Sequence, residues 1–338
     1  MNGKWLIRGR DGRLSVYQLS GDAVLCRAER VPGGSWDAPR KIGGDQRLHP
    51  VLSVGQGIDA YGHLVSWRPT VADESGLVHS THFRPLLAPL DWEPIGHPNG
   101  KGRCTGDPSV AVDNQGRAHV FVRNAKGGLS MRAQSIKGGW GPWFDLGGED
   151  IQGPPAAVAG KNGRWEVYAV APGALLHRRQ EKPATGVVVE ERAEVAARPG
   201  TLCAVATSEE NTTLFFTDEV GELCAWRPGS KPQALISAAG PGPVAAIRCE
   251  LDGHDCTMLA QRSSNGRVVF AAYPTEDESA GAWWTESGPI LPVDAEIALA
   301  KDAEDRVVAA ALSPSTGRLL ISRRKDEPGL ALTAWQEV

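Results

Sequence analysis

The stretch that decides the fold runs from Pro108 to Gly148 and reads PSVAVDNQGRAHVFVRNAKGGLSMRAQSIKGGWGPWFDLGG. It contains four short runs rich in small apolar, β-branched or aromatic residues, separated by turns rich in glycine and asparagine. Runs of this kind between such turns predict β-strands joined by hairpins. The stretch therefore predicts one four-stranded antiparallel sheet.

The third strand of this unit, a turn glycine followed by an apolar run, recurs seven times along the chain. The aliphatic residues that mark it are Leu25, Leu77, Leu129, Leu175, Leu223, Val268 and Leu319, on average 49 residues apart. A period of that length is typical of propeller blades, whereas a pair of β-sandwiches does not explain seven even spacings. We predict an all-β, seven-bladed β-propeller of four-stranded antiparallel blades, a single domain over residues 1–338. Its blades are expected at about 3–46, 47–100, 104–150, 151–196, 197–240, 241–290 and 291–338.

The first strand of each repeat is small and apolar, as in Pro108–Val112 and Pro155–Ala159. Small side chains suit the innermost strand, because blades converge there and space is short. The first repeat begins near residue 3 and the last ends at 338, so the ring is expected to close at a blade boundary without a swapped strand. A closed ring leaves only the outermost strands as exposed edges.

Charge and hydropathy exclude several classes of function. The formal net charge of the 338 residues is −4, which argues against a broad basic surface and against a nucleic-acid partner. No apolar run is long enough to span a bilayer, so we expect no membrane insertion. The N-terminus has no visible signal peptide, so we expect a cytoplasmic protein and leave open release from the cell by an unconventional route. The oligomeric state is also left open.

The six cysteines are too sparse for a disulfide scaffold and show no CxxC pair. Cys249 and Cys256 are placed to face each other across one hairpin. Reduced thiols are the favoured interpretation, and a disulfide between these two is the alternative.

Tryptophan is the unusual residue, with 11 copies against 6 Phe and 4 Tyr. The predicted fourth strand carries one in five of the seven repeats, at Trp36, Trp92, Trp143, Trp284 and Trp335. Trp140 and Trp283 are surplus to the repeat. An indole matches the apolar C–H face of a pyranose, so these seven residues are candidate sugar contacts. The alternative is that they pack between blades.

A second candidate site lies at the mouth of the central channel, where the inner strands begin. Polar residues there are expected to gather into an axial pocket for a polar ligand: His49, Asp107, Gln152, Arg198 and Asp294. The alternative is that they only cap strand ends. His79 and His82 are expected to point to opposite faces of one strand, which argues against a shared metal. We expect no metal site.

The repeat pattern resembles that of the Photorhabdus-lectin-like (PLL-like) seven-bladed propellers. The likeness rests on Pro-x-Val-Ala-x-Asp-x-x-Gly-Arg and Trp-x-x-Trp-x-x-Leu-Gly-Gly in the third repeat, and extends to Pro154–Gln180 in the fourth. It implies a carbohydrate-binding protein, notably for fucose and O-methylated glycans, with sites between blades lined by aromatic residues. Among the third strands quoted for comparison, only Cys224-Ala225-Trp226 keeps the family's second aromatic.

No GxSxG, HExxH, P-loop, GxGxxG or EF-hand pattern is present, and neither are the Ser-x-Asp-x-Gly-x-x-Trp boxes of sialidases. We therefore favour a lectin-like protein without a cofactor, with a glycan or small molecule as its partner. One alternative is an enzyme of lyase or cyclase type acting on a small metabolite in the axial pocket. A second is a protein-interaction platform with an exposed apolar patch.

Overall fold

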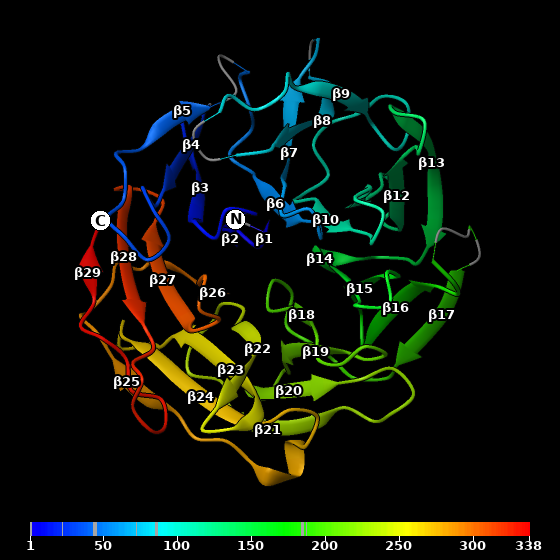
Figure 1. Ribbon diagram of the computed structural model, residues 1–338. Coiled ribbons are helices and arrows are strands. Elements are labelled where there is room, and N and C mark those ends of the chain that lie inside the picture. The colour runs from blue at the N-terminus through cyan, green and yellow to red at the C-terminus, as the bar shows by residue number, and fades with distance from the viewer. Residues whose placement is uncertain are drawn as a thin grey trace.

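The computed structural model describes residues 2–21, 23–42, 46–71, 73–84, 87–183, 186 and 188–338. Seven antiparallel sheets stand around a central axis (Figure 1). Each takes four consecutive strands from one segment of the chain, and they pair in sequence order from the axis to the rim. The prediction of a seven-bladed propeller is confirmed.

Blade 1 consists of β2 (Leu6–Arg8), β3 (Leu14–Ser20), β4 (Ala23–Ala28) and β5 (Arg40–Ile42), and blade 2 of β6 (Ser53–Gln56), β7 (Gly62–Pro69), β8 (Ser75–His82) and β9 (Glu93–Gly96). Blade 3 consists of β10 (Ser109–Val112), β11 (Ala118–Arg123), β12 (Leu129–Gln134) and β13 (Trp140–Gly147). Blade 4 consists of β14 (Gln152–Ala159), β15 (Trp165–Ala171), β16 (Ala174–Gln180) and β17 (Val188–Ala193). Blade 5 consists of β18 (Cys203–Ala206), β19 (Thr212–Thr217), β20 (Glu222–Trp226) and β21 (Gln233–Ser237). Blade 6 consists of β22 (Ala245–Leu251), β23 (His254–Arg262), β24 (Val268–Pro274) and β25 (Thr285–Ser287). Blade 7 consists of β26 (Glu296–Lys301), β27 (Val307–Ser313), β28 (Arg318–Arg323) and β29 (Gln336–Glu337). A short 3-10 helix, η1 (Glu278–Ala280), precedes β25.

The core lies between the blades. Every residue of the second strands β15 and β27 is buried, because both faces of a middle strand meet a neighbouring blade. Between blades 3 and 4, for example, Phe121 meets Trp165 edge to face with ring centroids 5.1 Å apart. Strands buried on both faces read as continuous apolar runs rather than as alternating ones. This is why the periodicity of the blades is visible in the sequence.

The chain begins inside the ring. Strand β1 (Asn2–Gly3) pairs in parallel with β6 on the axial edge of blade 2, and the backbone N–H of Lys4 donates to Val54 O at 3.0 Å. Blade 2 is therefore a five-stranded sheet. The sequence did not predict this strand, because two residues carry no repeat signal.

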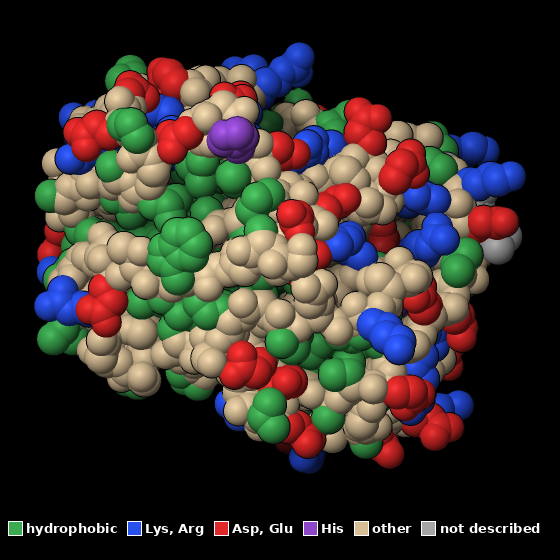
Figure 2. Space-filling model, turned by 90° about the horizontal axis from the view of Figure 1, so that it is seen from below, with side chains coloured by type: hydrophobic (Ala, Val, Ile, Leu, Met, Phe, Trp, Pro, Cys, Tyr) green, Lys and Arg blue, Asp and Glu red, His purple; other side chains and the backbone are tan. Residues whose placement is uncertain are grey.

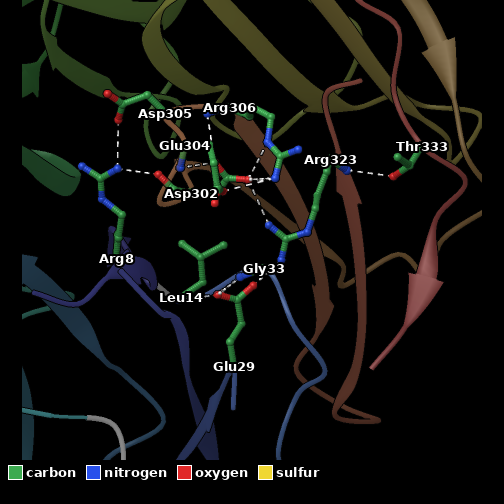
Figure 3. A network of polar contacts seen from close by, with 10 residues as sticks. All are labelled: Arg8, Leu14, Glu29, Gly33, Asp302, Glu304, Asp305, Arg306, Arg323 and Thr333. Carbon is green, nitrogen blue, oxygen red and sulfur yellow. Dashed lines mark hydrogen bonds and ion pairs between the residues drawn. The ribbon is translucent and has the colours of Figure 1, made fainter. Parts of the chain in front are cut away.

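A network of buried ions joins blade 7 to blade 1 (Figure 3). Glu29 and Asp302 are fully buried, and Arg323 reaches both carboxylates, with a distance of 3.3 Å to Asp302 Oδ2. Arg306 also pairs with Asp302 at 3.0 Å, and Arg8 donates to the Asp302 carbonyl. Blades 1 and 7 come from opposite ends of the chain. These contacts therefore close the ring, and among the described strands none of blades 1 and 7 is exchanged across the closure.

Among the described residues, none of the helical segments has the length and apolar character needed to cross a bilayer.

Candidate functional site

The tryptophans of the repeat lie at the start of the outer strands. Trp140 and Trp143 belong to β13. Three others directly precede a named outer strand: Trp92, Trp284 and Trp335. Trp36 forms an isolated bridge with Glu29 ahead of β5. These five blades share a tryptophan in or shortly before the outer strand, although Trp36 lies four residues ahead of β5 and Trp143 lies inside β13, and the surroundings of the indoles differ.

Three of these indoles bond to the preceding blade. Trp140 Nε1 donates to Glu93 Oε2 at 3.1 Å, between blades 2 and 3. Trp284 Nε1 donates to the Ser237 carbonyl at 2.8 Å, and Trp335 Nε1 donates to Ser287 Oγ at 3.2 Å. The acceptors all lie in the outer strand of the blade before. This recurring bond ties the rims of successive blades together, and the sequence analysis missed it.

Only one of these three bonds has a charged acceptor, the Glu93 carboxylate. The blade 2–3 junction is defined here as Glu93, Gly96, Arg132, Trp140 and Trp143. Arg132 Nε donates to Gly141 O at 2.6 Å and its Nη1 donates to Ile95 O. The Nε1 of Trp143 is buried and has no hydrogen-bond partner among the described residues. Burial lowers the pKa of Arg132 and the nearby Glu93 carboxylate opposes that shift.

Gly96 brings the backbone of blade 2 close to these side chains. A Cβ at this position would lie 3.5 Å from Arg132 Nη1 and 4.0 Å from Trp143 Nε1, and the φ of 74° favours glycine. Two indoles, a guanidinium and an exposed carboxylate thus converge where blades 2 and 3 meet.

Two buried histidines stand behind Trp140. His79 meets its ring edge to face at 5.1 Å, and His79 Nε2 lies 3.0 Å from His63 Nδ1. Burial lowers the pKa of His63 to about 4 and that of His79 to about 3, so both rings are neutral at pH 7. His82 points the other way and bonds to Tyr17 in blade 1 at 2.7 Å. The expected divergence of His79 and His82 is confirmed.

Arginines occupy the matching place in the third strands of three blades. Arg27 bonds to Val338 O, Arg132 to Ile95 O and Arg178 to Leu146 O, in each case a carbonyl of the preceding blade. The sequence analysis did not single them out as sites. Their offset of two or three residues after the marker aliphatic was the available signal.

The other candidate tryptophans differ in exposure. Trp92 is 7% exposed and packs with buried residues of blade 1. Trp36 and Trp335 are half-buried, and Trp335 stacks on Phe270 with centroids 6.3 Å apart. Trp283 is 73% exposed.

Seen from the rim near β21 and β25, acidic and basic side chains are interspersed and apolar side chains gather in a hollow (Figure 2).

The inner strands line an axial channel with a cavity of about 540 Å³. Its wall is mostly small and apolar, as the sequence predicted, and its polar lining includes Lys4, Asp107, Cys203, Asp294 and Glu296. Burial raises the pKa of Asp107 and Glu296, lowers that of Lys4 and raises that of Cys203 to about 11. Asp294 is held by Ser313 and Ser315, and these bonds lower its pKa.

The five predicted axial residues do not form one cluster. Asp107 and Asp294 line the channel, but His49 Nε2 lies 2.9 Å from Ser75 Oγ, and Arg198 donates to Glu219 O at 2.8 Å. Gln152 lies in a separate cavity lined also by residues of blade 3. His49 and Arg198 lie four and five residues before their inner strands begin, so the chain has not yet reached the axis there. No group of three or more metal-ligating side chains is found among the described residues.

Comparison with known proteins identifies the fold. No family model and no curated protein matches the chain. Among solved structures, a variant of AofleA from Arthrobotrys oligospora with three arginines replaced by alanine is 11% identical, with a TM-score of 0.56, covering 85% of this chain and 86% of that one. A variant of the Aleuria aurantia lectin in complex with Fucα1-6GlcNAc is 13% identical, with a TM-score of 0.51 and coverages of 84% and 94%. The Hadza microbial sialidase Hz136 is 12% identical, with a TM-score of 0.53 and coverages of 87% and 71%. At these identities the likeness shows a common propeller fold, shared by lectins and a sialidase.

Proposed function

We propose that this chain is a carbohydrate-binding protein and that it binds a glycan at the blade 2–3 junction. The observation that carries the proposal is the convergence of Trp140 and Trp143 with Glu93 and Arg132. An indole face matches the C–H face of a pyranose, while a carboxylate and a guanidinium bond to its hydroxyls.

One of the structures with the same fold supports this class of ligand, because the Aleuria aurantia lectin variant is described in complex with the fucosylated disaccharide Fucα1-6GlcNAc. The resemblance to PLL-like propellers points to the same ligands, so we propose a fucosylated or O-methylated glycan. The sialidase shares the fold, but this sequence lacks the Ser-x-Asp-x-Gly-x-x-Trp boxes.

A glycan array probed with the purified protein tests the proposal. We expect binding to fucosylated or O-methylated glycans that is lost in Trp140→Ala. Trp284→Ala is the matched control, because that indole makes the same bond to the preceding blade but donates to a backbone carbonyl. It should retain binding. An array without signal, or equal binding by Trp140→Ala and the unaltered chain, would overturn the proposal.

The axial channel supports a second candidate function, the binding of a small molecule. Its cavity of about 540 Å³ has a mostly apolar lining that includes three ionisable side chains, Lys4, Cys203 and Asp107, and burial shifts the pKa of each. A largely apolar cavity with a few perturbed ionisable groups is a general feature of ligand sites. A thermal-shift screen of metabolites tests it. A true axial ligand raises the Tm of Trp140→Ala as it does that of the unaltered protein, but not that of Cys203→Phe, in which the channel is filled. A screen without any such ligand would count against this function.

A further inference from the structure

The two cysteines of the inner hairpin of blade 6 face each other across the sheet. In the register of β22 and β23, Cys249 is directly opposite Cys256. Directly opposed residues of an antiparallel pair have Cα atoms about 4.5 to 5.5 Å apart. A disulfide accepts Cα separations of about 4.4 to 6.8 Å. The Cα separation expected from this register therefore lies within the range that a disulfide accepts.

Both thiols point to the same side of the sheet. Cys249 and Cys256 are buried together with Leu251 and Met258, two residues further along each strand, in the cluster between blades 6 and 7. Neither sulfur is bonded in this structure, in which all six cysteines are free thiols. Their side chains are thus neighbours in one apolar layer.

We infer that Cys249 and Cys256 form a redox modification site, which closes to an intramolecular cross-strand disulfide when the protein meets a disulfide oxidant such as glutathione disulfide. One cysteine thiolate attacks a glutathione sulfur and releases one glutathione. The second cysteine then attacks the resulting mixed disulfide and releases the other. The protein gives up two electrons and two protons, and the oxidant becomes two molecules of glutathione.

The surroundings of the pair make the reaction slow. Burial raises the pKa of both thiols, that of Cys249 to about 11. Lys301 and Arg324 oppose the shift at Cys249, whereas Asp255 and the Cys256 thiol reinforce it. Asp255 and Asp252 raise the pKa of Cys256. Because the thiolate is the reacting form, few thiols are ready to attack at pH 7.

Two hydrogen bonds hold the hairpin turn against blade 7, and they are called the clamp here. Asp252 and Gly253, with φ values of 52° and 79°, form the tight turn three residues from each cysteine. The Asp252 carboxylate accepts a bond from Arg324 Nη2 at 3.1 Å and one from the Gly329 N–H at 2.7 Å, both from blade 7. Release of this clamp would let the hairpin lift and expose the thiols.

The folded full-length chain is treated with glutathione disulfide at pH 8.5, and its thiols are then counted by alkylation, intact mass and peptide mapping. We expect two of the six thiols to disappear, with one disulfide joining Cys249 to Cys256 and no retained glutathione on either. The rate should rise about tenfold from pH 7.5 to 8.5, because both pH values lie below the raised pKa of the thiols.

Three variants provide the controls. Cys256→Ala should form no intramolecular disulfide, whereas Cys104→Ala/Cys203→Ala, which removes two half-exposed cysteines, should oxidise as before. Asp252→Ala should oxidise several-fold faster. Far-ultraviolet circular dichroism checks that each variant is folded. The inference is overturned if Cys249 and Cys256 stay as thiols while the oxidant is in excess, if each carries a separate glutathione, or if they bond to other cysteines.

Discussion

The junction between blades 7 and 1 and the junction between blades 2 and 3 use charged residues in opposite ways. In the first, Glu29 and Asp302 are fully buried and share Arg323. In the second, Glu93 and Arg132 lie at a half-exposed surface beside two tryptophans, one with an unpartnered Nε1.

The difference follows from connectivity. Blades 2 and 3 are consecutive in the chain and share a buried layer that includes Val65, Trp67 and Val120. Blades 7 and 1 also share an apolar layer, which includes Leu6, Val308 and Leu312. They come from opposite ends of the chain, however, and the buried ions add side-chain contacts across that closure. Blades 2 and 3 are joined by the chain itself, so the rim residues of their junction need not hold the ring together.

The largest effect is expected at the closure. Glu29→Ala leaves Arg323 without one of its carboxylates and leaves the buried N–H of Leu14 without its acceptor. Breaking a buried ion pair from one side costs about 3–5 kcal/mol, so the free energy of unfolding should fall by that amount. Urea denaturation measures it. Glu93→Ala, at the blade 2–3 junction, should change the free energy of unfolding by less than about 1 kcal/mol. Equal effects of the two variants would contradict the distinction between the two junctions.

The second effect is a pH dependence of stability that arises from the two buried histidines behind Trp140, at the blade 2–3 junction. The folded pKa values of His63 and His79 are about 4 and 3, below the unfolded value of about 6.5, so the unfolded chain binds more protons in between. Above pH 6.5 both histidines are neutral in the folded and in the unfolded chain, and the free energy of unfolding does not depend on their titration. As the pH falls from 6.5 toward 4, that free energy decreases by about 1.4 kcal/mol per pH unit for each proton that the unfolded chain binds and the folded chain does not.

Urea denaturation between pH 6.5 and 4.5 tests this effect on the double variant His63→Gln/His79→Gln. Its stability should depend less steeply on pH than that of the unaltered chain. His82 and His119, whose pKa values burial also lowers, keep part of the slope. An unchanged slope in the double variant would contradict the assignment.

The third effect concerns binding. Trp143→Ala should weaken glycan binding at least tenfold, about 1.4 kcal/mol, because it removes one of the two aromatic faces of the junction. Isothermal titration with a glycan that binds on the array measures it. Trp335→Ala, at the blade 6–7 junction, should leave the affinity unchanged although it lowers stability. Loss of binding in both variants would show that the tryptophans act only through the fold.

The smallest effect separates the buried and exposed parts of the closure itself. Arg8 and Asp305 form an ion pair 2.9 Å long with side chains 40% and 70% exposed. Exposed pairs contribute about 0–1 kcal/mol, so Asp305→Asn should shift the urea midpoint only slightly. A loss as large as that of Glu29→Ala would mean that the closure depends on its surface as much as on its buried ions.

The sequence alone determined the architecture. The seven markers near a 49-residue period, the small inner strands and the glycine turns predicted the blades, because each blade repeats the same local pattern of burial. It also predicted a tryptophan within the fourth strand of five repeats, but only Trp143 lies inside its strand, and the other four precede theirs. Local pattern could not predict β1, a two-residue strand whose only support is its partner β6.

The tertiary structure decided which residues meet. Arg323 and Glu29 are 294 residues apart, and no spacing pattern in the sequence indicates that they pair. The bond from Trp140 to Glu93 likewise depends on how the outer strands of blades 2 and 3 pack together. The predicted axial set separated for the same reason, since His49 and Arg198 stop short of the axis while Lys4 and Glu296 reach it. Repeats fix the shape of a blade through local hydrogen bonds and burial. The sites lie between blades, where side chains from distant parts of the chain come into contact.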